Sequence, residues 1–255
     1  MHEIKPKSLH QKIRVGAVSY LNAKPLTYGL ERGAISEQIE LSYAPPAVLA
    51  DKLKAGEIDM GLVPVAALSV IKASQVVGDY CIGAEGAVES VALFSDCELS
   101  EIEEIYLDYE SRTSAALLRI LLKEKWRISP LLKQAEPGYE NNIKGKVAGL
   151  IIGDRALRQK DKTTFKFDLS LAWQELTGLP FVFAAWISNR ELSEEFIRDF
   201  NEGNAYGLNR LDEVIKKIHF PEYDLHRYYS TDIQYELDAK KAEGMRLFLE
   251  KISVS

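Results

Sequence analysis

The 255-residue sequence has few cysteines and histidines, and neither set is spaced like the ligands of a metal. Its two cysteines are Cys81 and Cys97, and its four histidines are scattered along the chain. A zinc or redox site needs such residues in close pairs. We therefore expect no metal and no cofactor, and we interpret the cysteines as two reduced, partly buried thiols in preference to a disulfide.

Long basic runs and long apolar runs are also missing. The 32 Lys and Arg and the 38 Asp and Glu are interspersed, with a formal net charge of −6, whereas a nucleic-acid binder would carry a basic patch. No segment approaches the ~20 apolar residues of a membrane span, and the charged N-terminus lacks the apolar stretch of a secretory signal. We expect a cytoplasmic monomer or homodimer with a small-molecule partner, no nucleic acid and no membrane.

The common catalytic motifs are absent as well. There is no GxSxG elbow, no HExxH, no Walker loop and no GxGxxG in the sequence. What is present is a composition with 46% hydrophobic residues, which at this length allows a substantial buried core. The sequence thus predicts a globular protein whose chemistry does not follow from a familiar motif.

Apolar, β-branched runs alternate with amphipathic helix patterns along the chain. The predicted strands are 13–19, 39–43, 60–63, 91–94, 105–107, 147–152 and 181–185. The predicted helices are 25–30, 47–54, 65–71, 113–123, 155–159, 171–177 and 237–252, with further helix from Glu191. This alternation favours mainly parallel sheets in an α/β fold, and the pattern restarts after Phe94 as a second α/β unit.

Polar residues follow several predicted strands, where ligands of open α/β sheets bind. Tyr20 and Asn22 come after the first strand, and Asp154 with Arg155 follows another. Each also has an ordinary explanation. Asn22 suits a turn, Tyr20 suits packing, Asp154 suits a helix cap, and Arg155 suits a solvated surface.

The run 111–114, SRTS, precedes an apolar helix pattern. One of its hydroxyls is expected to cap the helix, and the remaining N–H groups and the helix dipole would attract an anion. An ordinary cap without a ligand is the alternative, and Ser90 has a similar alternative as the start of a strand. From the residues alone, the sequence predicts a two-lobed α/β protein that binds a small anion.

Six segments, in order over most of residues 13–186, resemble the chorismate dehydratase family. They are VGAVSYLNAKPLTYGLE (15–31), DMGLVPVAAL (59–68), GAVESVALFS (86–95), LDYESRTSAALLRILL (107–122), GLIIGDRAL (149–157) and LAWQELTGLPFVFAAW (171–186). The order of the segments argues against chance similarity. The tail after residue 186 and the leader before Ile13 are less diagnostic, and we assign them no chemical role.

The resemblance implies a two-lobed, periplasmic-binding-protein-like (type II) α/β fold with a ligand cleft between the lobes. Because no long Gly, Ser or Pro linker separates the two units, we expect two short crossings, near 93–95 and 184–186. The first lobe is then 1–94 plus 187–255, and the second lobe is 95–186.

The resemblance also implies that chorismate loses its ring hydroxyl as water and becomes 3-[(1-carboxyvinyl)oxy]benzoate, in the futalosine route to menaquinone. Carried over by position, the implied site is catalytic Asn22 with the substrate-binding candidates Ser90, Thr113, Ser114, Tyr20 and Asp154. The base that removes the ring proton stays open between a protein group and the enolpyruvyl carboxylate of the substrate.

Two alternatives remain beside this interpretation. The same fold serves solute-binding or sensing proteins for small anions, and a sister enzyme of the same architecture acts on cyclic dehypoxanthine futalosine. The SYLN motif at 19–22 argues against the sister enzyme. The missing secretion signal argues against a transport protein, and the missing helix-turn-helix segment argues against a DNA-binding regulator.

Overall fold

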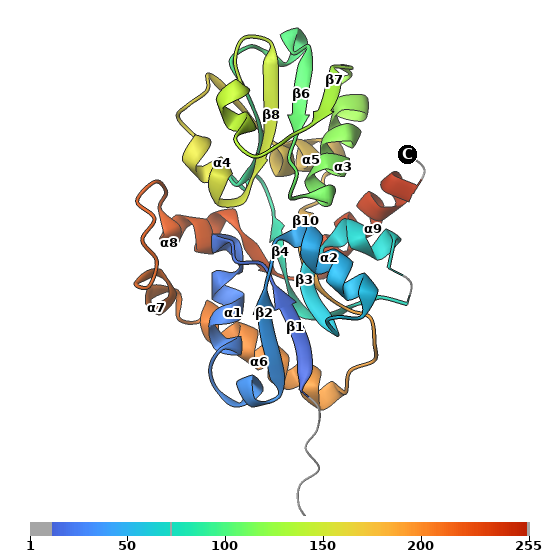
Figure 1. Ribbon diagram of the computed structural model, residues 1–255, viewed down its shortest axis with the longest axis vertical. Coiled ribbons are helices and arrows are strands. Elements are labelled where there is room, and N and C mark those ends of the chain that lie inside the picture. Colours follow the sequence, from blue (N-terminus) through green and yellow to red (C-terminus); the bar gives the residue numbers. More distant parts are fainter. Residues whose placement is uncertain (1–11, 72, 254–255) are drawn as a thin grey trace, which may run out of the picture.

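Two separate β-sheets organise the chain in the computed structural model, which describes residues 12–71 and 73–253. The six-stranded sheet contains β1 (Ile13–Ala17), β2 (Ile39–Tyr43), β3 (Met60–Pro64), β4 (Gln75–Ala84), β10 (Phe181–Ser188) and β11 (Gln234–Glu236). The five-stranded sheet contains β5 (Val91–Ser95), β6 (Glu104–Leu107), β7 (Leu131–Gln134), β8 (Val147–Ile152) and β9 (Phe165–Asp168). Figure 1 shows one sheet in each of two stacked lobes, which confirms the predicted two-lobed α/β fold.

Helices cover both sheets (Figure 1). The α-helices are α1 (Lys24–Leu30), α2 (Pro46–Ala55), α3 (Arg112–Ile120), α4 (Gly153–Gln159), α5 (Leu169–Thr177), α6 (Glu194–Leu208), α7 (Leu211–Ile215), α8 (Leu225–Arg227) and α9 (Ala239–Ser253). Two 3-10 helices also matter below, η1 (Leu21–Ala23) and η3 (Val65–Ser69). Within the described residues, no helix has both the length and the apolar character that a membrane crossing requires.

Strand directions are mixed, so the expectation of mainly parallel sheets is wrong. β1 runs parallel to β2 and β3, but β10 runs antiparallel to β3 and β4. In the other sheet β6 is parallel to β7 and β8, whereas β5 is antiparallel to β8 and β9. The reason is the double crossing: β10 returns from the second lobe and inserts between β3 and β4, so it runs against both.

The predicted crossings at 93–95 and 184–186 are also misplaced. β5 pairs with β8 and β9 in the second sheet, and β10 pairs with β3 and β4 in the first. The chain therefore crosses before each of these strands, at 85–90 and 178–180, and we place the lobe boundaries there. Both strands are continuous apolar runs, and such a run gives no local sign of the sheet to which it will hydrogen-bond.

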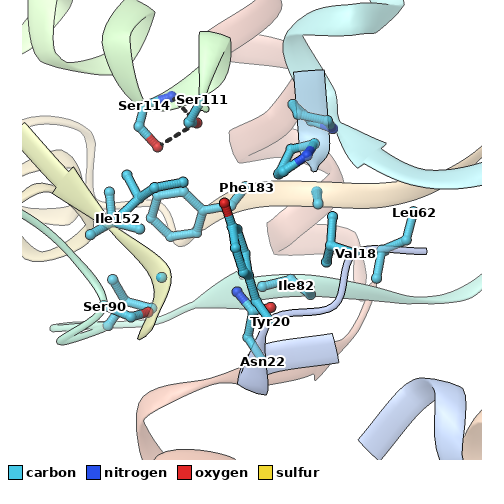
Figure 2. Close-up of a pocket in the computed structure, with 16 residues that line it drawn as sticks. Val18, Tyr20, Asn22, Leu62, Ile82, Ser90, Ser111, Ser114, Ile152 and Phe183 are labelled. Atoms are coloured by element: carbon cyan, nitrogen blue, oxygen red, sulfur yellow. Dashed lines mark hydrogen bonds between the residues drawn. The ribbon is translucent and has the colours of Figure 1, made fainter. Parts of the chain in front are cut away.

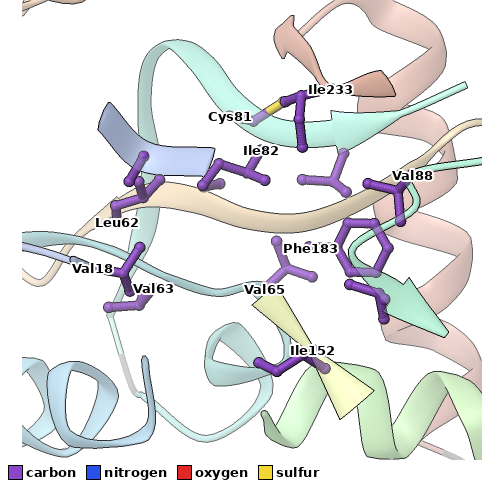
Figure 3. Close-up of a cluster of buried hydrophobic side chains, with 14 of the residues drawn as sticks. Val18, Leu62, Val63, Val65, Cys81, Ile82, Val88, Ile152, Phe183 and Ile233 are labelled. Carbon is purple, nitrogen blue, oxygen red and sulfur yellow. The ribbon is translucent and has the colours of Figure 1, made fainter. Parts of the chain in front are cut away.

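The apolar core continues from one lobe into the other around the crossings. Figure 3 shows Cys81 and Ile82 of β4 and Phe183 of β10 in the same buried cluster as Ile152 of β8. Burial raises the pKa of Cys81 to about 12. Both this thiol and that of Cys97 are free, which confirms the interpretation as two reduced cysteines.

Glycines allow α1, which begins shortly after the first strand, to pack closely on α6. A Cβ on Gly29 would lie 2.0 Å from the carbonyl oxygen of Gly203, and a Cβ on Gly207 would lie 1.9 Å from that of Pro25. Only glycine permits such an approach of two backbones. The backbone packing of α1 on α6 therefore fixes one end of the segment that contains Asn22.

Asp59 ties the start of β3 to β1. Its carboxylate accepts hydrogen bonds from the backbone N–H of Arg14 at 2.8 Å and from the Nε and Nη2 of the same residue at 3.1 and 2.9 Å. Burial by itself would raise the pKa of Asp59, but the hydrogen bonds and charge of Arg14 outweigh it and hold that pKa below its ordinary value. The ionised carboxylate is therefore the form that stabilises the fold.

We expect Asp59→Asn to lower the Tm by roughly 2–4 °C near pH 7, since the half-exposed Arg14 is partly screened by solvent. A lowered pKa contributes stability above the ordinary value of 3.8, and that contribution is lost as the pH falls through the lowered value. The Tm difference should thus shrink between pH 7 and pH 3 in thermal melts. A constant difference would contradict the role of the charge.

Candidate active site

A cavity between the two lobes collects several of the sequence-predicted residues (Figure 2). Its walls are largely apolar, with contributions from Val18, Leu62, Ile82, Ile152 and Phe183. Its volume of about 50 Å³ has room for a few waters, at ~10–15 Å³ each. A ligand with a ring therefore needs more space than this arrangement of the lobes leaves.

The polar lining of the cavity comes from both lobes. Figure 2 shows Tyr20 and Asn22 on one side, Ser111 and Ser114 on the opposite side, and Ser90 at one end. Apolar walls with a few converging polar groups are typical of small-molecule sites. This arrangement suits a ligand with an apolar ring and polar or anionic substituents.

Asn22 lies in η1, a few residues beyond the end of β1 and close to the strand end predicted from the sequence. Its Oδ1 is buried and makes no hydrogen bond within the described part of the chain. Its backbone carbonyl oxygen accepts a hydrogen bond from the Tyr235 hydroxyl at 2.9 Å. The backbone of Asn22 is therefore held, while its side-chain oxygen stays available to a ligand. A buried polar atom without a partner costs about 1–3 kcal/mol, a cost that a hydrogen bond from a ligand would remove.

Tyr20 reaches across the cleft to the second lobe. Its hydroxyl donates to Oε2 of Glu110 at 2.5 Å, and burial, followed by this hydrogen bond, raises its pKa. Its ring packs on Gly153, where a Cβ would lie 3.3 Å from the ring and where φ is +61°. The Tyr20 hydroxyl is therefore committed to Glu110, and its ring forms part of the cavity wall.

Ser90 is the last residue of the first crossing between the lobes. The N–H groups of Val88 and Glu89 donate to Oδ2 of Asp168 at 3.0 and 2.8 Å, and Glu89 adopts a left-handed φ of +65°. The Ser90 Oγ and the Tyr228 hydroxyl are both buried and lie close enough to interact with each other. A constrained turn thus presents the Ser90 hydroxyl to the cavity, next to that of Tyr228.

The N-terminus of α3 faces the cavity from the second lobe. Ser111 confirms the predicted cap, because its Oγ accepts from the Ser114 N–H at 3.0 Å and donates to the Ser114 Oγ at 2.8 Å. Both serines line the cavity. Thr113 lies outside the lining, and its Oγ1 instead accepts from the Ala66 N–H at 3.1 Å, which joins α3 to η3 of the first lobe.

Asp154 is likewise outside the cavity lining. Its Oδ1 accepts a hydrogen bond from the backbone N–H of Leu21 at 3.0 Å, so it holds the residue before Asn22. Burial raises the pKa of this carboxyl, although the Leu21 hydrogen bond opposes the shift. The structure thus places Asp154 next to the SYLN segment and not in contact with the ligand space.

Arg155 lies at the centre of a charged cluster behind Tyr20 and not on a solvated surface. Its guanidinium forms ion pairs of 2.7 to 2.8 Å with three carboxylates, those of Asp108, Glu110 and Glu140. The charge of these groups raises the Arg155 pKa despite the opposing effect of burial. The sequence signal for this cluster is weak, because its members come from three separate segments.

Sequence reasoning missed the contribution of the C-terminal tail. Tyr235 supports Asn22, as described above, and Tyr228 lies near Ser90. Tyr229 is also buried, with a hydroxyl that has no partner in the described residues. The adjacent pair Tyr228 and Tyr229 is the sequence feature that could have indicated this contribution. A tyrosine by itself, however, does not identify a contact with a residue more than 130 positions away.

Two lobes that enclose a ligand cavity between crossing strands define a protein of the periplasmic-binding-protein-like class. The fold is similar to that of a protein from Archaeoglobus fulgidus, with a TM-score of 0.74 and 17% identity over 95% of this chain and 97% of that one. It is also similar to the alkanesulfonate-binding protein of Xanthomonas axonopodis pv. citri, with a TM-score of 0.67 and 14% identity over 98% and 96% of the two chains. These likenesses concern the fold.

Within this class, the chain belongs to the menaquinone biosynthesis family, whose model matches residues 13–253. A chorismate dehydratase from Thermus thermophilus is 29% identical in an alignment that covers 94% of this chain and 95% of that protein. A chorismate dehydratase from Campylobacter jejuni is 34% identical over 98 residues, or 35% and 38% of the two chains.

Proposed function

We propose that the protein is a chorismate dehydratase, which converts chorismate into 3-[(1-carboxyvinyl)oxy]benzoate and water. The observation that carries the proposal is the buried, unpartnered amide oxygen of Asn22 at the cavity, in a family of menaquinone biosynthesis. The chorismate dehydratase of Thermus thermophilus, similar over almost its whole length, supports the same reaction.

The cavity matches the chemistry of this substrate. Its apolar walls suit the carbocyclic ring, and the serines at the N-terminus of α3 suit a carboxylate. The reaction removes a proton from the ether-bearing ring carbon and breaks the bond to the ring hydroxyl, so the ring becomes aromatic and water leaves. Negative charge that develops on the ring carboxylate would be stabilised by fixed hydrogen-bond donors.

Asn22 and Ser90 would act through hydrogen bonds. An amide side chain donates and accepts but is no strong base, so we assign Asn22 to hold the departing hydroxyl and Ser90 to hold the substrate. The polar lining consists of amide and hydroxyl groups. That composition favours the enolpyruvyl carboxylate of the substrate as the proton acceptor over a protein base.

The direct test is to incubate the purified protein with chorismate and to follow products by chromatography and mass spectrometry. We expect the aromatic enolpyruvyl ether to form well above the uncatalysed background. Folded protein that binds chorismate without forming product would instead favour a small-anion binding protein of the same fold. The cytoplasmic location and the monomeric or dimeric state stay predictions.

A further inference from the structure

Two carboxylates of the second lobe hold the residues immediately before Asn22. Glu110 accepts a hydrogen bond from the Tyr20 hydroxyl at 2.5 Å, and Asp154 accepts one from the Leu21 backbone N–H at 3.0 Å. The SYLN segment belongs to the first lobe, directly after β1, whereas both carboxylates belong to the second lobe. These contacts therefore exist only while the lobes are together.

Both carboxylates are themselves fixed in place. Arg155 contacts Glu110 at 2.8 Å and also pairs with the fully buried Asp108 side chain at 2.8 Å. The planar guanidinium holds its partners in a defined geometry. Asp154 lies in the first turn of α4, where the helix dipole favours a negative charge. The second lobe thus presents a preorganised pair of acceptors to the segment.

The remaining support for Asn22 comes from its own lobe. The Tyr235 hydroxyl donates to the Asn22 carbonyl oxygen at 2.9 Å. Tyr235 lies in β11, which pairs antiparallel with β4 in the first sheet. When the lobes separate, this contact can persist while those of Glu110 and Asp154 are lost. The orientation of the Asn22 side chain is then less restricted in the open form.

We propose that Asp154 and Glu110 are positioning residues that complete the geometry of Asn22 only when the cleft closes. The inference rests on the proposed function, since it presumes that Asn22 acts on a bound substrate. Closure then does two things at once: it encloses the substrate, and it sets the amide that acts on it. Neither carboxylate needs to touch the substrate, which agrees with the place of both outside the cavity lining.

Asp154→Ala should lower kcat, because a displacement of about 1 Å at a reacting group costs on the order of 10²-fold in rate. We expect a 10- to 100-fold fall in kcat, in the range of that estimate, and a smaller rise in KM. Asp154→Asn should restore most of kcat, since its amide oxygen also accepts from the Leu21 N–H. A requirement for the negative charge itself would instead leave Asp154→Asn as slow as Asp154→Ala.

The chain offers a matched control in Asp51 of α2. Its carboxylate also joins the lobes, through an exposed ion pair with Arg112 at 3.1 Å, but it does not contact the SYLN segment. Asp51→Ala should therefore leave kcat within about twofold of the wild-type value, as expected for a surface pair.

Tyr20→Phe tests the Glu110 contact. It removes the hydroxyl that donates to Glu110 without a change of packing, and it should lower kcat, as Asp154→Ala does.

Hydrogen–deuterium exchange tests the positioning without any activity. With the aromatic enolpyruvyl ether bound to hold the cleft closed, amides in residues 18–26 should exchange faster in Asp154→Ala than in wild type, Asp154→Asn or Asp51→Ala. If exchange and kcat are both unchanged in Asp154→Ala, the proposal is wrong. It is also wrong if Asp154→Asn is as inactive as Asp154→Ala with unchanged exchange. An inactive wild-type protein would refute the proposed function, and exchange would then decide the positioning role by itself.

Discussion

Asn22→Ala should lower kcat by about 10²–10³-fold, the usual cost of removing one preorganised hydrogen-bonding group from an active site. The amide oxygen is buried at the cavity and, within the described residues, is not used by any protein group. Its removal should not disturb the fold, because it breaks no hydrogen bond of the side-chain oxygen. Steady-state rates with chorismate and circular dichroism spectra measure the two effects separately.

Asn142→Ala makes the matched change at an exposed position of the second lobe, and it should leave both the rate and the spectrum unchanged. An Asn22→Ala protein with wild-type turnover would remove Asn22 from the mechanism. A protein that loses activity only because it unfolds would show the loss in its spectrum first.

Gly207→Ala should cost about 3 kcal/mol of unfolding free energy, at the upper end of typical overpacking effects. The new Cβ would lie 1.9 Å from the carbonyl oxygen of Pro25 and 3.0 Å from the Tyr28 side chain, so α1 and α6 must separate. The oxygen belongs to the backbone and cannot move aside by a change of rotamer. Urea titration followed by circular dichroism gives the difference in free energy.

Gly56→Ala provides the comparison for this prediction. Gly56 ends α2 with φ at +72°, and a Cβ there would meet nothing within 4 Å. The left-handed backbone alone should cost roughly 1 kcal/mol. If the two alanine variants lose equal stability, the close approach of α1 and α6 is not the cause of the Gly207 effect.

The segment that contains Asn22 is held at both of its ends. The glycine contacts of α6 hold α1 and thus the residues after Asn22, within the first lobe. The carboxylates Glu110 and Asp154 hold the residues before it, from the second lobe. The first support is permanent, and the second depends on closure.

Many local elements could be predicted from the sequence. Strands β1, β2, β3 and β8 and helices α1, α2 and α5 lie within a few residues of their predicted ranges, because each combines a regular apolar pattern with clear boundary residues. The Gly56 helix end is an example. The end of the first strand, and with it the neighbourhood of Asn22, followed from the same pattern.

Other strands were missed for identifiable reasons. β7, β9 and β11 have only four, four and three residues, too few for a period-two pattern. β4 is long, but its run QVVGDYCIGA contains Gly78 at a φ of +71° and pairs irregularly with β10. Its strand character comes from the neighbours that hydrogen-bond to it.

The sequence by itself determined many of the local elements, the strand end where Asn22 lies, and that a hydroxyl of residues 111–114 caps α3. Only the tertiary structure decided which sheet receives β5 and β10 and which side chains hold the SYLN segment. Its contacts with Glu110, Asp154 and Tyr235 join residues 90, 133 and 213 positions apart. The physical reason is that apolar and helical patterns report a residue's own strand or helix, whereas these hydrogen bonds depend on how two lobes meet.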